Sequence, residues 1–162
     1  MSDFTRFTAE HYLTKDSEAS KVLGKDYQRV TKAFTYYIGH EHSDKWVTVP
    51  EGFLTDGASI PKIFQWLLPP FGEYAQAATL HDWLCEHYYV YHDTDDFHPT
   101  TLPVDRKEID RIMYEAMRVL GVAKWRRTLI QGGLDTYRFL TRPKKPVVDP
   151  RKVELEKRVF NS

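Results

Sequence analysis

The sequence predicts an α+β fold, with a small antiparallel N-terminal sheet followed by a bundle of about three helices. Short runs rich in β-branched and aromatic residues occupy the first third of the chain. Longer runs with the three-to-four-residue apolar spacing of helices follow in the remainder. Strands that precede helices, rather than alternating with them, are typical of α+β proteins.

The strands of the expected sheet lie in the segment 27–55. The run YQRVTKAFTYYI at 27–38 is rich in β-branched and aromatic residues and predicts one strand. The polar run GHEHSDK predicts a turn and WVTV at 46–49 a returning strand, so we expect a hairpin. FLT at 53–55 predicts a short third strand, whereas residues 1–26 are mixed and polar and predict no element.

A short helix is expected first, and longer ones follow it. Ser59 suits an N-cap, and Pro69 and Pro70 end this short helix after two turns. The next expected helix covers 71–89 and is followed by a polar loop at 90–103.

Two more helices complete the expected bundle. Asp105 followed by Glu108 is a capping box that predicts a helix start, and Gly121 suits the end of that helix. The last helix is expected at 123–140, interrupted by Gly132-Gly133. We expect a single α+β domain at 1–140 and a proline- and charge-rich C-terminal arm at 141–162.

The composition excludes several classes of protein. The 23 Lys and Arg residues balance the 23 Asp and Glu residues, so nucleic acid is not an expected partner. The basic run KWRRTL at 124–129 is either a solvated helix face or a contact for phosphate. No apolar run reaches the ~20 residues of a transmembrane segment, and no signal-peptide pattern is present. The single cysteine, Cys85, allows no intramolecular disulfide, so we expect a protein made in a cytoplasm.

The candidate site centres on the dipeptide His81-Asp82 in the run AATLHDWLCEHYY. Helical spacing puts His81 in the middle of an apolar stripe and Asp82 at its edge. Asp110 lies at the rim of the apolar face of the next long helix, where it could accept a hydrogen bond from His81. A carboxylate that orients a histidine makes the imidazole a general base, and Asp82 would be free to bind a hard cation. A buried histidine with two solvated aspartates fits the same pattern equally well.

Four motifs carry a resemblance to a known family: GFLTDGASIP, LLPPFG, A-x-x-HDWL and D-R-x-M-x-E-A-M. In this order they resemble a protein family that is found in tailed phages and prophages and is called domain-of-unknown-function thirteen-fifty-three. The resemblance covers about residues 47–130. Membership implies a phage or prophage origin and names no mechanism. The family pattern usually has a tyrosine where this chain has Cys85.

The His-Asp pair also resembles, at the level of motifs, calcium-dependent secreted phospholipases of the A-two type. This resemblance implies that His81 is the base, that Asp110 orients it, and that Asp82 binds calcium. The upstream loop around Asp56 and Gly57 would supply further oxygen ligands. The loop lacks the fuller glycine pattern of those enzymes, and Cys85 replaces their tyrosine.

Two functional classes therefore stay open. The first is a metal-dependent ester hydrolase, with a phospholipid as its expected substrate, acting as a phage enters or leaves its host. It predicts a cleft that reaches His81. The second is a structural or accessory phage protein, such as a head or tail component incorporated in the virion. It predicts that His81 is inaccessible to solvent and that the arm at 141–162 binds another virion protein.

Overall fold

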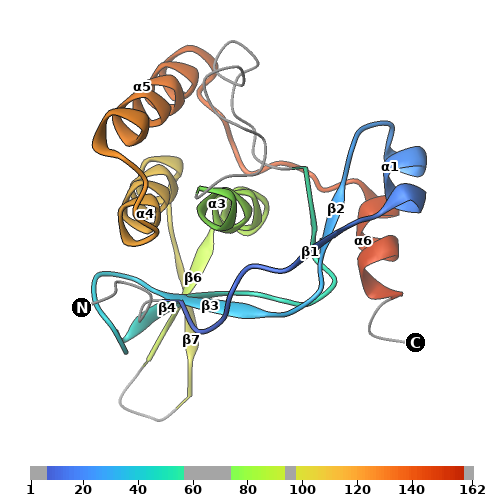
Figure 1. Ribbon diagram of the computed structural model, residues 1–162, viewed down its shortest axis with the longest axis horizontal. Helices are drawn as coiled ribbons and strands as arrows, with labels where there is room; N and C mark the ends of the chain where they lie inside the picture. The colour runs from blue at the N-terminus through green and yellow to red at the C-terminus, as the bar shows by residue number, and fades with distance from the viewer. Residues whose placement is uncertain (1–6, 57–73, 94–97, 159–162) are drawn as a thin grey trace.

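The structure is a computed structural model, and it describes residues 7–56, 74–93 and 98–158. Two antiparallel sheets and five helices make up this described part (Figure 1). The strands are β1 (Leu13–Lys15), β2 (Gln28–Val30), β3 (Phe34–Tyr37), β4 (Lys45–Val49), β5 (Leu54–Thr55), β6 (Tyr89–His92) and β7 (Thr100–Pro103). The helices are α1 (Ser17–Leu23), α3 (Ala75–His87), α4 (Arg106–Val119), α5 (Lys124–Thr141) and α6 (Pro150–Lys157).

The larger sheet has the order β3-β4-β6-β7 and carries helices α3 and α4 on one face (Figure 1). Helix α5 packs on α4, on the side away from the sheet. The main core lies between this sheet and these helices, because apolar side chains from both are withdrawn from water there. Its most completely buried members include Phe34, Tyr36, Val47, Leu80, Leu84, Ile109, Ile112, Met113 and Met117.

The smaller sheet has the order β1-β2-β5 and lies beside helices α1 and α6. Helix α1 begins at the N-cap Asp16, whose carboxylate accepts a hydrogen bond from the backbone of Ala19 at 2.8 Å. Leu155 of α6 is buried in a second apolar cluster with Ala19, Tyr27 and Leu54. Helix α6 therefore packs on the smaller sheet and on α1.

The predicted architecture of one N-terminal sheet followed by a three-helix bundle is wrong, although the chain is α+β overall. The run at 27–38 is not one strand: residues 31–33 are exposed, and the chain changes from one sheet to the other there. The segment 90–103 is not a loop either. Its ends form the hairpin β6–β7, because the β-branched and aromatic residues of β6 pair with β4 through Trp46 and Tyr91.

Several predicted boundaries agree with the structure. The hairpin β3–β4 is present, and Asp105 caps α4 by accepting a hydrogen bond from the Glu108 backbone at 2.8 Å. Helix α5 is continuous through Gly132-Gly133, so the predicted interruption is wrong. The buried Gly133 faces the core, and tertiary packing there outweighs the low helix propensity of glycine. The predicted helix that begins at Ser59 lies outside the described residues.

Candidate functional site

His81 lies on the inner face of α3 and is only 2% exposed. Its Nε2 atom is 2.7 Å from Oδ1 of Asp110, which lies in the first half of α4 and is fully buried. The small side chains of Ala77 and Ala78 are buried on the same face of α3. The structure thus brings together the two residues that the sequence predicts as a pair.

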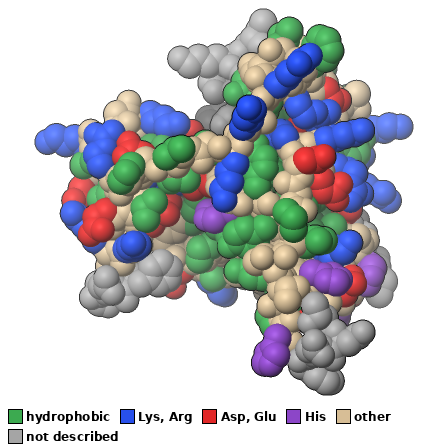
Figure 2. Space-filling model, turned by 180° about the vertical axis from the view of Figure 1, so that it is seen from behind, with side chains coloured by type: hydrophobic (Ala, Val, Ile, Leu, Met, Phe, Trp, Pro, Cys, Tyr) green, Lys and Arg blue, Asp and Glu red, His purple; other side chains and the backbone are tan. Residues whose placement is uncertain are grey.

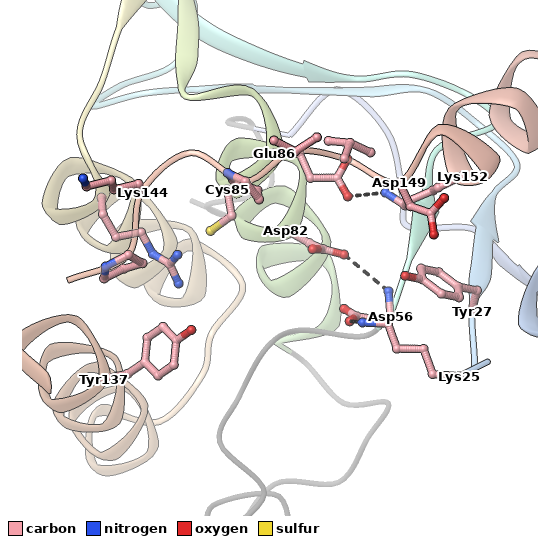
Figure 3. Close-up of a pocket in the computed structure, with 15 residues that line it drawn as sticks. Lys25, Tyr27, Asp56, Asp82, Cys85, Glu86, Tyr137, Lys144, Asp149 and Lys152 are labelled. Carbon is pink, nitrogen blue, oxygen red and sulfur yellow. Dashed lines mark hydrogen bonds and ion pairs between the residues drawn. The ribbon is translucent and has the colours of Figure 1, made fainter. Parts of the chain in front are cut away.

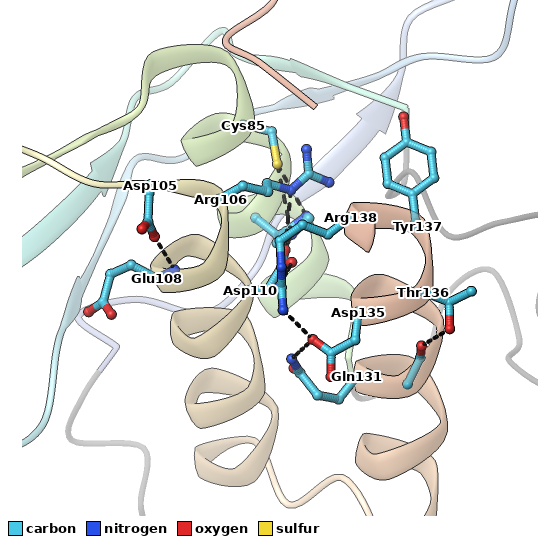
Figure 4. A network of polar contacts seen from close by, with 12 residues as sticks. Cys85, Asp105, Arg106, Glu108, Asp110, Gln131, Asp135, Thr136, Tyr137 and Arg138 are labelled. Carbon is cyan, nitrogen blue, oxygen red and sulfur yellow. Dashed lines mark hydrogen bonds and ion pairs between the residues drawn. The ribbon is translucent and has the colours of Figure 1, made fainter. Parts of the chain in front are cut away.

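Two arginines complete the hydrogen bonds of Asp110 (Figure 4). Arg106 Nε lies 3.2 Å from Oδ1, and Arg138 Nη1 lies 2.6 Å from Oδ2. Burial would raise the pKa of Asp110, but the hydrogen bond from His81 and the charge of Arg106 lower it below its ordinary value. Asp110 is therefore an ionised carboxylate that joins α3, α4 and α5.

The protonation of His81 follows from its surroundings. Burial lowers the pKa of His81, and it outweighs the opposing effect of Asp110. The imidazole is therefore neutral near pH 7. Because the ionised Asp110 can only accept, the proton lies on Nε2, and Nδ1 carries the unprotonated lone pair. A neutral imidazole held in this tautomer has the state that a general base needs.

Cys85 contacts the face of this imidazole. Its sulfur is 3.6 Å from Nδ1 and 3.8 Å from Nε2 of His81. A sulfur in line with the Nδ1 lone pair would be much farther from Nε2, so the thiol does not point along that lone pair. Burial also raises the pKa of Cys85 to about 12. Both observations argue against Cys85 as a nucleophile activated by His81.

A pocket of about 370 Å³ has Cys85 in its wall (Figure 3). Helix α3 contributes Asp82, Cys85 and Glu86 to its wall, and α4 contributes Arg106. The segment 143–149 between α5 and α6 forms another part of the wall. His81 is not among the lining residues, whereas Cys85 both lines the pocket and contacts the His81 ring.

Asp82 is the most perturbed carboxyl group of the pocket wall. Burial, followed by the charge of Asp56, raises its pKa to about 7. Its Oδ2 accepts hydrogen bonds from the Thr55 hydroxyl at 2.9 Å and from the backbone of Asp56 at 3.3 Å. The carboxyl group is therefore poised to change its protonation near neutral pH.

Two lysines of this wall pair with its carboxylates. Lys25 lies 2.6 Å from Oδ2 of Asp56. Lys152 of α6 is 4% exposed and pairs with Glu86 and, at 3.1 Å, with Glu156. No local pattern in the sequence indicates Lys152, because its position depends on the packing of α6. Arg106 could have been found, since it precedes Asp110 by one helical turn.

The predicted calcium ligands form at most part of a ligand set. Asp56 and Asp82 are close together, and Oδ1 of Asp56 is buried without a partner among the described residues. Lys25 nevertheless neutralises Asp56, and the described acidic, histidine and cysteine side chains form no group of three that could hold a metal ion. Gly57 lies outside the described residues. The described residues alone therefore do not make a complete calcium site.

Comparisons with known proteins identify the family of the chain. No curated protein and no solved structure matches it. Among the described helices, none has the length and apolar character needed to cross a bilayer. The model of one family, described as a protein of unknown function (DUF1353), matches residues 28–132, which is more than half of the chain. The chain therefore belongs to the DUF1353 family.

Proposed function

We propose that this protein hydrolyses an ester, with His81 as general base and Asp110 as the carboxylate that orients it. One observation carries the proposal: the 2.7 Å bond from Nε2 to Asp110 leaves the Nδ1 lone pair of a neutral imidazole one side chain from a polar pocket. Asp110 would also stabilise the imidazolium that forms when Nδ1 takes up a proton. Arg106 and Arg138 support this role because they keep Asp110 ionised.

In the proposed reaction, Nδ1 of His81 removes a proton from water, and the resulting hydroxide attacks the carbonyl carbon of the ester. The bond to the alcohol oxygen then breaks, and the imidazolium returns the proton to the departing alkoxide. Because His81 is buried and does not line the pocket, water must reach Nδ1 as the neighbouring Cys85 side chain changes rotamer. Resemblance to the A-two phospholipases favours a phospholipid as the ester. Resemblance to the tailed-phage family of unknown function favours a phage or prophage as the source of the protein.

A second candidate is a structural or accessory phage protein, and the burial of His81 favours it. In that case the hydrogen bonds of Asp110 hold α3, α4 and α5 together and perform no chemistry. The segment 141–162 would then contact another virion protein.

The test is release of fatty acid from phospholipid vesicles and of alcohol from a soluble short-chain ester. The wild type is compared with His81→Gln and with Glu10→Gln, a substitution of an exposed residue. Turnover that His81→Gln abolishes and Glu10→Gln preserves, with circular dichroism unchanged, supports the hydrolase. Absence of turnover on both substrates, with and without calcium, contradicts it and favours the structural candidate.

We propose separately that the protein binds calcium, with Asp82, Asp56 and Gly57 as the ligands. Calcium is titrated into the wild type and into Asp82→Asn, and the midpoint temperature of thermal unfolding is measured at each concentration. This tests the calcium site without an activity measurement. A rise of the midpoint in the wild type alone supports a site at Asp82. An equal response of both proteins contradicts it.

A further inference from the structure

Helix α5 exposes large apolar side chains on the face that points away from α4. Trp125, Leu129, Phe139 and Leu140 are 55%, 39%, 78% and 73% exposed. With the small residues Gly132 and Thr136 between them, they follow helical spacing and form one continuous stripe. We call this stripe the outer face of α5. An apolar stripe of this length, unpaired with any described element, indicates a binding surface.

The buried side of the same helix points in the opposite direction. Ile130, Gly133 and Leu134 are buried, and α5 packs on α4. At 100° per residue, Leu134 lies about half a turn from Trp125 and Thr136 around the helix axis. The outer face therefore takes no part in the core that the described residues form.

Positive charge lies beside the outer face, although Arg127 and Arg138 point toward α4. Residues 124–145 contain seven Lys and Arg residues and one Asp, although the chain as a whole has no net charge. The guanidinium of Arg126 lies 5.2 Å from the centre of the Trp125 ring, and Lys124, Arg142 and Lys145 are exposed. Figure 2 shows basic side chains gathered with apolar ones at its upper right, where α5 lies in this reversed view.

We propose that the outer face of α5 docks on an anionic lipid surface. A helix with Trp, Phe and Leu on one face and Lys and Arg at its margins matches the interface of a bilayer, where rings enter the acyl boundary and cations meet lipid phosphates. Charge complementarity selects an anionic surface. The preference for lipid over an acidic protein rests on the proposed function, because a phospholipid hydrolase must meet its substrate at a bilayer.

The location of the outer face fits this purpose. Phe139 and Leu140 lie in the last turn of α5, and the chain then continues into the segment 143–149, which lines the pocket. Val147 in that segment is 96% exposed. Docking through the end of α5 therefore brings the pocket wall next to the lipid headgroups.

The test is binding to vesicles, measured by co-sedimentation of the full chain. The probes are vesicles of phosphatidylcholine alone and of phosphatidylcholine mixed with phosphatidylglycerol. We expect binding to the mixed vesicles that weakens as salt is raised. Removing two side chains in Phe139→Ser/Leu140→Ser should weaken it by about tenfold or more. Lys124→Glu/Lys145→Glu should weaken it on the anionic vesicles only.

The matched control is Val22→Ser, because Val22 is 40% exposed on α1, on the other side of the molecule. Binding that is absent, or that Phe139→Ser/Leu140→Ser and Val22→Ser reduce equally, overturns the proposal. Concentration-dependent self-association that only Phe139→Ser/Leu140→Ser abolishes, without vesicle binding, also overturns it and assigns the face to a second copy. Turnover of the soluble ester separates this proposal from the proposed function, since docking variants should leave that turnover unchanged.

Discussion

His81 and Asp82 are neighbours on α3, but their side chains have opposite kinds of surroundings. The His81–Asp110 pair is buried, and arginines from two helices satisfy both oxygens of Asp110. Asp82 lies in a pocket wall beside Asp56, which has one oxygen buried without a partner among the described residues. The first network is closed and the second is incomplete. A closed network stabilises the fold, whereas an incomplete one keeps polar groups available for a ligand.

The largest expected effect is the loss of the closed network. Asp110→Ala leaves the charges of Arg106 and Arg138 without their buried partner, so we expect the free energy of unfolding to fall by about 3 to 5 kcal/mol. Urea unfolding at neutral pH measures this change. Asp135→Ala is the matched control, because Asp135 also pairs with Arg138 but its side chain is 49% exposed. It should cost less than about 1 kcal/mol. Similar losses in both variants would contradict the difference between the two networks.

The candidate site was more predictable than the fold, and the reason is physical. His81 and Asp110 each lie on or beside an apolar helical stripe, and the spacing within one helix determines which residues share a face. The contact between them needs only that α3 and α4 pack together. The positions of Arg138 and Lys152 depend on how α5 and α6 pack, which no local pattern in the sequence specifies.

The errors in the fold come from pairings between distant segments. Strand β5 pairs with β2, and β6 pairs with β4, so the division into two sheets depends on long-range partners. The strand β7 has four exposed residues and a proline, so its sequence resembles a loop. For helix α5 the prediction failed in the opposite way, because it placed a break where the structure is regular. The glycine pair suggested an interruption, but tertiary packing keeps the helix continuous.

The two networks should also respond to pH in opposite directions. The pKa of Asp82 is raised to about 7, so the folded state holds a proton that the unfolded state loses. Its contribution to stability therefore falls as the pH rises from about 4 to about 7. The pKa of His81 is lowered, so its contribution falls as the pH drops below the unfolded value of about 6.5.

Unfolding in urea at about pH 5 and about pH 8 measures these slopes. Relative to the wild type, Asp82→Asn should gain about 1 to 3 kcal/mol between the lower and the higher pH. His81→Gln should show the opposite trend, with its deficit smallest at low pH. Parallel curves for the wild type and Asp82→Asn would show that the carboxyl group titrates normally, and that its surroundings are more polar than the burial of Asp82 indicates.

The smallest expected effect belongs to Cys85, which lies between the two networks. Its sulfur packs on the His81 ring and is not aligned with Nδ1, and its thiol is neutral because burial raises its pKa to about 12. Cys85→Ala should therefore change the free energy of unfolding by about 1 kcal/mol or less.

The native thiol should react slowly with a disulfide reagent at pH 8 and rapidly after unfolding. Ester turnover in Cys85→Ala should equal or exceed that of the wild type, because a smaller side chain opens the path from the pocket to Nδ1. Loss of turnover with the fold intact would instead make the thiol part of the chemistry and join the two networks into one site.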